Sequence, residues 1–169
     1  MLVSLSKSLH RFAEAVAAAL LAVIFVAFIA QIALRYLLNW PVGWTTELSL
    51  AAWLWLVLWG AAFVLREDEE IRIDPVVDRA PDKLRRVLVG AGALAIAVLF
   101  AMSLRASWDY VTFMKVEKSS YLGIRMDWTY SIYLLFAVAV VIRALRQLLR
   151  AIRGTLPPPP APGASSSAL

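Results

Sequence analysis

Four long apolar segments, separated by polar connections, dominate the hydropathy pattern of this 169-residue chain. A helix that crosses a bilayer needs about 20 apolar residues, and each segment reaches or approaches that length. The pattern therefore predicts an all-α integral membrane protein whose four transmembrane helices pack as one helical bundle. The expected spans are about 12–34, 47–65, 84–108 and 128–149. A signal peptide is an alternative for the first segment, but its apolar run exceeds the roughly 7–15 residues of such a peptide.

Polar segments at the two ends lie outside the membrane domain, which we expect to cover residues 12–153. Residues 1–11 place leucines at helical spacing, which is typical of an amphipathic N-terminal arm on the membrane surface. A frayed extension of the first span fits this segment equally well. Residues 154–169 are rich in proline and serine and predict a disordered or polyproline tail. For residues 164–169, a remnant of cloning is an alternative interpretation to a native tail.

The composition supports a membrane protein and excludes several kinds of site. Hydrophobic residues make up 62% of the chain and charged residues 17%, against about 45–50% and 25% in soluble domains. The absence of cysteine excludes disulfides, thiolate metal sites and cysteine nucleophiles. The single histidine argues against a haem subunit, which commonly needs two axial histidines. Since no catalytic motif is visible either, we expect neither an enzyme nor a cofactor.

Lysine and arginine are distributed unevenly between the two sides of the predicted membrane domain. The termini and the middle connection carry 12 of them, and the first and third connections carry five. Positive charge marks the cytoplasmic side, so both termini are expected to be cytoplasmic. An aromatic belt is expected at the opposite interface. It comprises Tyr36, Trp40, Trp44, Trp108, Tyr110, Tyr121, Trp128 and Tyr130.

The net charge of +5 does not indicate nucleic-acid binding, because the basic residues flank the apolar segments instead of forming one patch. In the middle connection seven acids nearly balance six bases. There, Asp74 followed by Pro75 is typical of a helix N-cap with proline at the first helical position. A short surface helix and a solvated charged loop both fit this segment. Pro81 is expected to open the third span.

The interiors of the predicted spans are almost free of ionisable residues. A channel or pump usually places such residues in mid-membrane, and a transporter's own substrate site is usually marked by Gly/Pro-broken helices. Neither feature is evident, so the chain is expected to be an accessory subunit that does not translocate a solute by itself. Two alternatives stay open: a self-sufficient homo-oligomeric small transporter or channel, and a membrane anchor subunit of another complex.

A few polar and aromatic residues are candidates for a subunit interface or a structural role. Arg35 ends the first span, and Arg105 and Asp109 end the third with the spacing of neighbours on a helix face. Glu47 is expected in the first turn of the second span, just after Trp44, where a carboxylate is favoured by the helix dipole. It is either a capping or snorkelling carboxylate, or a member of an inter-helix or inter-subunit ion pair, with Arg35 as a candidate partner.

Tryptophans are unusually frequent in the second span. Trp55 and Trp59 share one helix face, and Trp53 lies on another. Such a face fits lipid contact or packing between helices, and it also fits docking of a larger membrane partner. No catalytic, substrate-binding or metal-binding residue is expected.

Short motifs along residues 10–150 occur in a characteristic order. They are Arg35-Tyr36, Trp44-Thr45-Thr46-Glu47, Trp59-Gly60-Ala61-Ala62 followed by Arg66, Ile71-Arg72-Ile73-Asp74 followed by Pro81, and Leu122-Gly123-Ile124. In this combination the chain resembles the small permease subunits (DctQ-like, Q subunits) of tripartite ATP-independent periplasmic (TRAP) transporters. It departs from the family pattern at Thr46, where an acid is common, and at Glu70, where histidine is frequent.

The resemblance implies a place in a sodium-coupled secondary transporter of organic acids such as dicarboxylates, in the bacterial inner membrane. It implies two protein partners: a large TRAP membrane subunit (DctM-like) and a periplasmic substrate-binding protein. The large subunit would hold the substrate and sodium sites. The small subunit would be a fixed scaffold in the lipid bilayer that supports the large subunit and helps to dock the binding protein.

Overall fold

The computed structural model describes residues 2–40, 42–65 and 81–156, with side chains from residue 8 onward. Four long helices form there. Each is long and apolar enough to cross a membrane, where the second span combines α2 with the π-helical turn η1 that continues it. The predicted four-span fold is therefore confirmed. The elements are α1 (Leu2–Leu37), α2 (Gly43–Trp59), η1 (Gly60–Val64), α4 (Asp82–Phe113), the 3-10 turn η2 (Met114–Val116) and α5 (Met126–Arg153).

Some sequence predictions fall outside the described residues. They concern the short helix expected at Asp74–Pro75, the conformation of the tail beyond residue 156, and the amphipathic character of residues 1–7, whose side chains are not described. The backbone of α1 is one continuous helix from Leu2 to Leu37.

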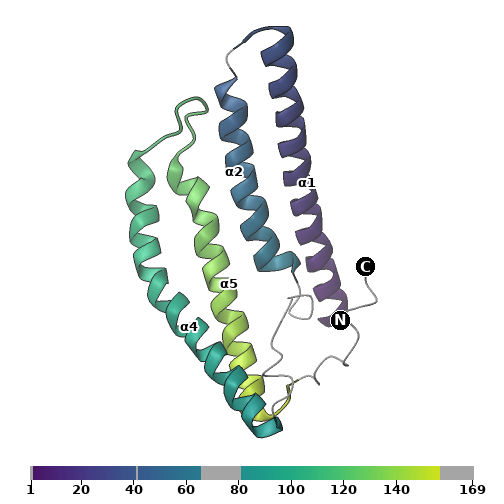
Figure 1. Ribbon diagram of the computed structural model, residues 1–169, viewed down its shortest axis with the longest axis vertical. Helices are drawn as coiled ribbons and strands as arrows, with labels where there is room; N and C mark the ends of the chain where they lie inside the picture. Colours follow the sequence, from purple (N-terminus) through teal and green to yellow (C-terminus); the bar gives the residue numbers. More distant parts are fainter. Residues whose placement is uncertain (1, 41, 66–80, 157–169) are drawn as a thin grey trace.

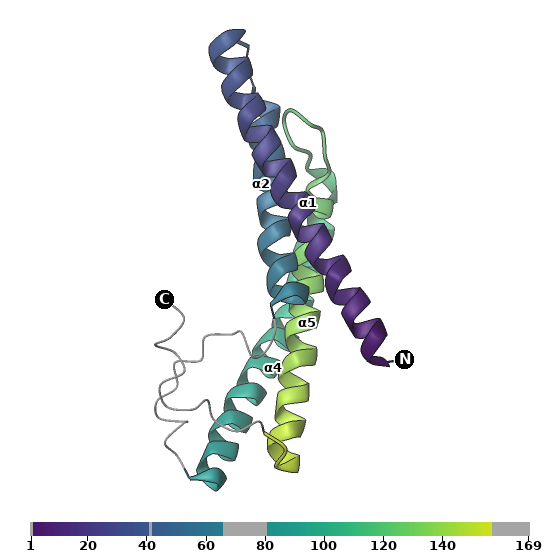
Figure 2. The ribbon, with the colours of Figure 1, turned by 90° about the vertical axis from the view of Figure 1, so that its right-hand side faces the viewer.

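The four long helices form an open row in the order α1, α2, α5, α4 (Figure 1). α2 packs between α1 and α5, and α4 packs on α5; in the described ranges no direct packing joins α1 to α4 or α5. Figure 2 shows α1 crossing α2 obliquely. The one helical bundle expected from the sequence thus takes the form of an open row. Because the helices are apolar on most sides, lipid can solvate faces that water could not, and closure is unnecessary.

Small residues line the contact between α4 and α5. Ala137, Ala144 and Ala151 recur every seven residues along α5 and are almost fully buried. Ala93 and Ala97 are the buried residues of the apolar part of α4. Small side chains allow two helix backbones to approach closely, which is the usual way in which helices associate inside a membrane. The alanines therefore let α4 and α5 pack closely, and the ring pairs Phe100–Phe136 and Tyr110–Tyr130 add to the same contact.

The connections between α1 and α2 and between α4 and α5 lie at the same end of the row (Figure 1). The aromatic residues of the predicted belt gather around this end. Tyr36, Trp40, Trp108, Tyr121 and Trp128 are all more than half exposed, as expected for side chains that meet an interface between lipid and water. We call this end the aromatic end, and the other the basic end.

Candidate functional site

A small hairpin, residues 117–126, connects α4 to α5 at the aromatic end. Its two arms are joined by backbone hydrogen bonds: the Met126 N–H donates to the Glu117 carbonyl over 3.0 Å, and the Ser119 N–H donates to the Ile124 carbonyl over 2.9 Å. The Ser119 hydroxyl also accepts the Ile124 N–H over 3.2 Å. This connection is therefore an ordered element with a defined tip.

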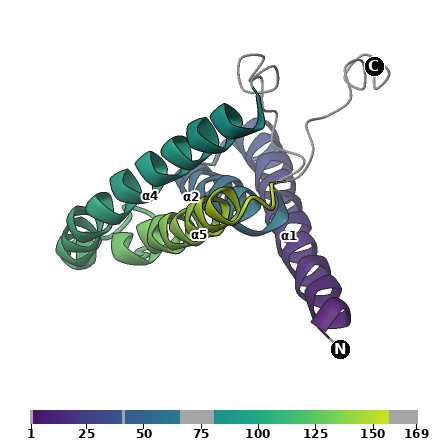
Figure 3. The same cartoon turned by 90° about the horizontal axis from the view of Figure 1, so that it is seen from below.

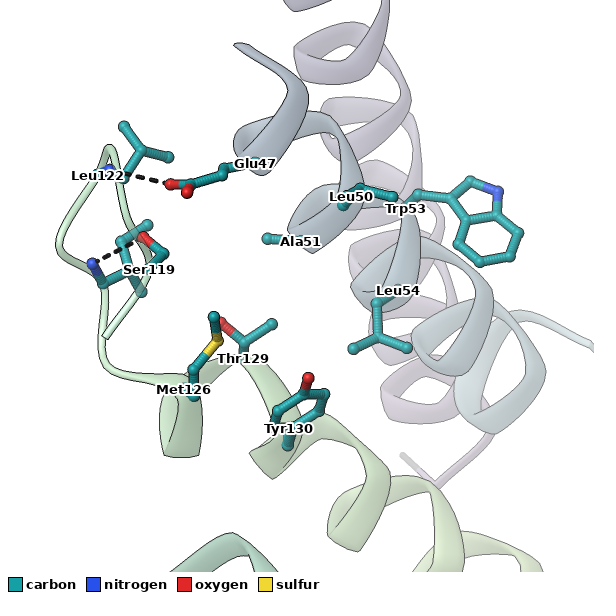
Figure 4. Close-up of a pocket in the computed structure, with 11 residues that line it drawn as sticks. Glu47, Leu50, Ala51, Trp53, Leu54, Ser119, Leu122, Met126, Thr129 and Tyr130 are labelled. Atoms are coloured by element: carbon teal, nitrogen blue, oxygen red, sulfur yellow. Dashed lines mark hydrogen bonds between the residues drawn. The ribbon is translucent and has the colours of Figure 1, made fainter. Parts of the chain in front are cut away.

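Glu47 of α2 holds the tip of the hairpin (Figure 4). The Tyr121 N–H donates to both carboxylate oxygens of Glu47, over 3.0 and 3.1 Å, and the Leu122 N–H donates to Oε2 over 3.0 Å. Gly123, with φ of 63°, follows in the left-handed conformation that glycine adopts without strain. Consecutive N–H groups in such a turn form a concave anion site, which here is filled by a carboxylate from another helix.

The expectation that Glu47 sits in the first turn of its helix is wrong. α2 begins at Gly43, and its first turn contains no acid. The helix starts this early because the Val42 carbonyl accepts both the N–H of the fully buried Thr45, over 3.2 Å, and its hydroxyl, over 2.6 Å. Glu47 is thereby moved one turn into the helix, from where its carboxylate reaches the hairpin.

Gly43 allows the hairpin to lie directly on the start of α2. A Cβ at this position would come within 2.2–2.7 Å of ring atoms of Tyr121, which is closer than side chains can approach without moving. The Tyr121 ring thus covers the Gly43 backbone while the Tyr121 N–H binds Glu47. Two independent contacts fix the hairpin to α2.

The base of the hairpin is fixed to α5 by an ion pair. Arg125 Nε donates to Asp127 Oδ1 over 3.1 Å, and Nη2 donates to Oδ2 over 2.6 Å. Paired bonds of this kind impose a planar geometry on both groups. The hydrogen bond to Asp127 raises the pKa of Arg125 above its ordinary value.

An apolar groove of about 310 Å³ lies between α2, α5 and the hairpin, with Glu47 at its rim (Figure 4). Leu50 and Leu54 of α2 line one side, and Met126 and Tyr130 of α5 line the other. Ser119, Leu122 and Ile124 of the hairpin close the groove at the aromatic end.

The two candidate tryptophans of α2 join neighbouring helices. Trp55 Nε1 donates to the Thr129 carbonyl of α5 over 3.2 Å, and Trp59 Nε1 donates to the Ala13 carbonyl of α1 over 3.1 Å. Trp53 is 58% exposed. Of the uses considered for this face, packing between helices is the one observed for Trp55 and Trp59.

Replacing Trp59 with phenylalanine is expected to destabilise the isolated protein by about 1 kcal/mol, because an aromatic ring is kept while the Nε1 hydrogen bond and the smaller ring of the indole are lost. The measurement is the free energy of unfolding in mixed micelles of mild detergent and SDS. Trp53→Phe is the matched control, since it changes an exposed indole on the same helix and should stay within about 0.5 kcal/mol of the parent. Equal effects of the two substitutions would contradict the role of the Trp59 bond.

Arg143 ties α5 to the basic end of α2. Its Nη2 donates to the carbonyls of Ala61, Ala62 and Leu65 over 2.7, 2.5 and 3.3 Å. The last carbonyls of a helix have no partner within it and carry the negative end of its dipole, and Arg143 supplies both a donor and a positive charge. Sequence reasoning counted Arg143 only as one of the positive charges flanking the last span.

The remaining candidate residues are not brought together. Arg35 lies in the last turn of α1 and forms no ion pair with Glu47, and Arg105 and Asp109 of α4 form none with each other, among the described residues. Trp44 lies in the first turn of α2 with 37% of its surface exposed. The described ranges hold no group of three histidine or acidic residues close enough to bind a metal ion.

A row of four apolar spanning helices, with a hydrogen-bonded hairpin at one end, defines a multi-pass integral membrane protein. The family model described as "Tripartite ATP-independent periplasmic transporters, DctQ component" matches residues 24–154, which is most of the chain. The chain therefore belongs to the DctQ family: it is a small permease subunit of a TRAP transporter in the bacterial inner membrane. The family inferred from the sequence motifs is confirmed.

Two relatives from Vibrio cholerae illustrate the range of the family. The chain is 25% identical to the "Sialic acid TRAP transporter small permease protein SiaQ" over 164 residues, which cover 97% of this chain and 91% of the relative. It is 33% identical to the "C4-dicarboxylate TRAP transporter small permease protein DctQ" over 82 residues, or 48% of this chain. That alignment spans only 35% of the relative.

Proposed function

We propose that this subunit is the fixed membrane scaffold of a sodium-coupled TRAP transporter for an organic acid. In this proposal it supports a large membrane subunit that holds the substrate and sodium sites. The transported class is suggested by the names of the two relatives, which refer to sialic acid and C4-dicarboxylates. Both are carboxylates.

The open row of helices is the observation that carries the scaffold role. Only 6–17% of the residues in the most apolar stretch of each helix are buried within the chain. The row thus offers two broad apolar faces, and a membrane partner can pack on one while lipid covers the other. The described spans also place their charged residues toward the helix ends, which supports a role without a solute path of its own.

The hairpin at the aromatic end supports the second part of the proposal, which is docking of the periplasmic binding protein. With both termini in the cytoplasm, as the charge distribution favours, residues 117–126 face the periplasm. The hairpin is held by Glu47 and by the Arg125–Asp127 pair. A surface that is ordered before binding loses less conformational entropy when a partner docks.

The test is reconstitution of this subunit with the large membrane subunit of its transporter, followed by uptake of labelled dicarboxylate into liposomes. We expect the two membrane subunits to co-purify. Uptake should require both of them, the binding protein and an inward sodium gradient. Liposomes holding this chain alone should show no uptake. Flux through the lone chain, or full uptake in its absence, would contradict the scaffold role.

A further inference from the structure

The basic end of the row carries a second feature, which the transport role does not use. Along α5, Arg146, Arg150 and Arg153 follow each other at spacings of four and three residues. Residues three and four apart share one face of a helix, so these side chains form a line, which we call the arginine stripe. All three are exposed.

A fourth cation joins the stripe from the neighbouring helix. The start of α4 and the end of α5 lie together at the basic end (Figures 1 and 3). The guanidinium of Arg86 lies against Gly154, where a Cβ would come within 2.7 Å of Nη1. Gly154 ends α5 in the left-handed conformation, with φ of 70°. Arg86 therefore extends the positive surface across the end of α5.

An apolar stripe runs beside the arginines. Leu145, Leu149 and Ile152 each precede one arginine of the stripe, and they are 45%, 49% and 73% exposed. Successive residues of an α-helix are about 100° apart around its axis, so the two stripes lie on adjoining faces. Cations beside exposed aliphatic side chains, at the end of a spanning helix, match the two parts of a phospholipid: an anionic headgroup and its acyl chains.

We propose that the arginine stripe and Arg86 bind the headgroup of an anionic phospholipid, with phosphatidylglycerol chemistry, whose acyl chains lie along Leu145, Leu149 and Ile152. Guanidinium groups bind phosphate oxygens through paired, charge-assisted hydrogen bonds. Arg86, Arg146 and Arg153 form no ion pair in the part of the chain that the structure describes. The site is independent of the transported substrate and of the scaffold role.

A competing occupant is the segment 66–80 of the same chain, which carries six acids and three arginines. The apolar stripe favours the lipid, because a highly charged segment would leave Leu145, Leu149 and Ile152 uncovered. The two occupants predict different binding: a site filled by the chain's own acids would have no preference for an anionic lipid.

The test is native mass spectrometry of the full chain in a nonionic detergent, titrated with short-chain phosphatidylglycerol or phosphatidylcholine. Each cation near an anionic surface strengthens attraction roughly fivefold. The variant Arg86→Gln/Arg146→Gln/Arg153→Gln should therefore weaken phosphatidylglycerol binding by roughly a hundredfold at low salt. Arg150 is left intact because it has a further interaction within the protein.

Three controls separate the lipid site from its alternatives. The variant Arg35→Gln/Arg105→Gln removes two cations at the aromatic end and should bind phosphatidylglycerol like the parent. The variant Arg86→Lys/Arg146→Lys/Arg153→Lys should retain much of the binding, because the charge is kept. Inorganic phosphate should not displace the lipid, since it lacks acyl chains.

Equal binding of the two lipids, an unchanged affinity of the glutamine variant, or displacement by inorganic phosphate would each overturn the proposal. If the triple variant fails to elute as a single helical species, Arg146→Gln alone replaces it. The expected loss is then roughly fivefold.

Discussion

Replacing Glu47 with alanine is expected to free the tip of the hairpin while leaving membrane insertion intact. Three hydrogen bonds from the Tyr121 and Leu122 amides lose their acceptor, and the alanine side chain cannot replace it. In hydrogen exchange, protection of these two amides should fall on the order of tenfold. In the reconstituted transporter, we expect the apparent affinity for the binding protein to weaken roughly tenfold, as when an interface loses its preorganisation.

Glu117→Ala is the matched control for Glu47→Ala, because it removes another carboxylate of the hairpin and keeps the backbone bonds of that residue. It should leave both measurements unchanged. Glu47→Gln should be intermediate, since the amide retains one oxygen acceptor but places a donor where the second acceptor was. Unchanged exchange of the Tyr121 and Leu122 amides in Glu47→Ala would show that Glu47 does not hold the hairpin.

Arg143→Met is expected to have the largest effect on stability. Methionine has a similar length and is apolar, but it cannot donate to the carbonyls of Ala61, Ala62 and Leu65. A buried acceptor that loses its donor destabilises a protein by about 1–3 kcal/mol. The bonds to Ala61 and Ala62 are partly buried and the bond to Leu65 is exposed, and averages in membranes are lower, so each carbonyl should contribute less than that. We therefore expect a loss of about 2–3 kcal/mol in the free energy of unfolding, measured in mixed micelles.

Arg146→Met provides the comparison for Arg143→Met, since it removes an exposed arginine one turn further along α5. In detergent without anionic lipid it should change stability by less than about 0.5 kcal/mol. Arg143→Lys should fall between the two, because one ammonium can reach fewer of the three carbonyls. If Arg143→Met and Arg146→Met unfold alike, the contact with the end of η1 contributes nothing to stability.

The number of spans and the family could be predicted from the sequence because both rest on local patterns. Apolar length identifies a spanning helix without knowledge of its neighbours, and the motifs from Arg35 to Ile124 preserve their order along the chain. The open order of the row could not be predicted in this way. In lipid a helix that is apolar on all sides carries no signal for which side meets a neighbour.

The hydrogen bonds of Glu47 and Arg143 could not be predicted from the sequence either, because their partners are backbone groups. Glu47 binds backbone N–H groups 74 and 75 residues away, and backbone groups leave no trace in the side-chain pattern. The same holds for Arg143, whose acceptors are the carbonyls of Ala61 and Ala62 in η1 and of Leu65 just after it. Gly123 offered a signal, because glycine before a helix predicts a turn, but it does not identify the partner of that turn.

The contacts between α2 and α5 determine how the row responds to force. The Thr129 carbonyl and Arg143 are 14 residues apart on α5, or about 21 Å along the helix, and both bind α2 or its continuation η1. Together with the contacts of Glu47 to the hairpin, these bonds join the pair α1–α2 to the pair α4–α5. They lie near both ends of the contact between α2 and α5. Sliding of one pair along the other would break all of these bonds at once, so the row resists shear normal to the membrane. In the proposed scaffold role, a large subunit that carries a solute across the bilayer would load the row in this direction.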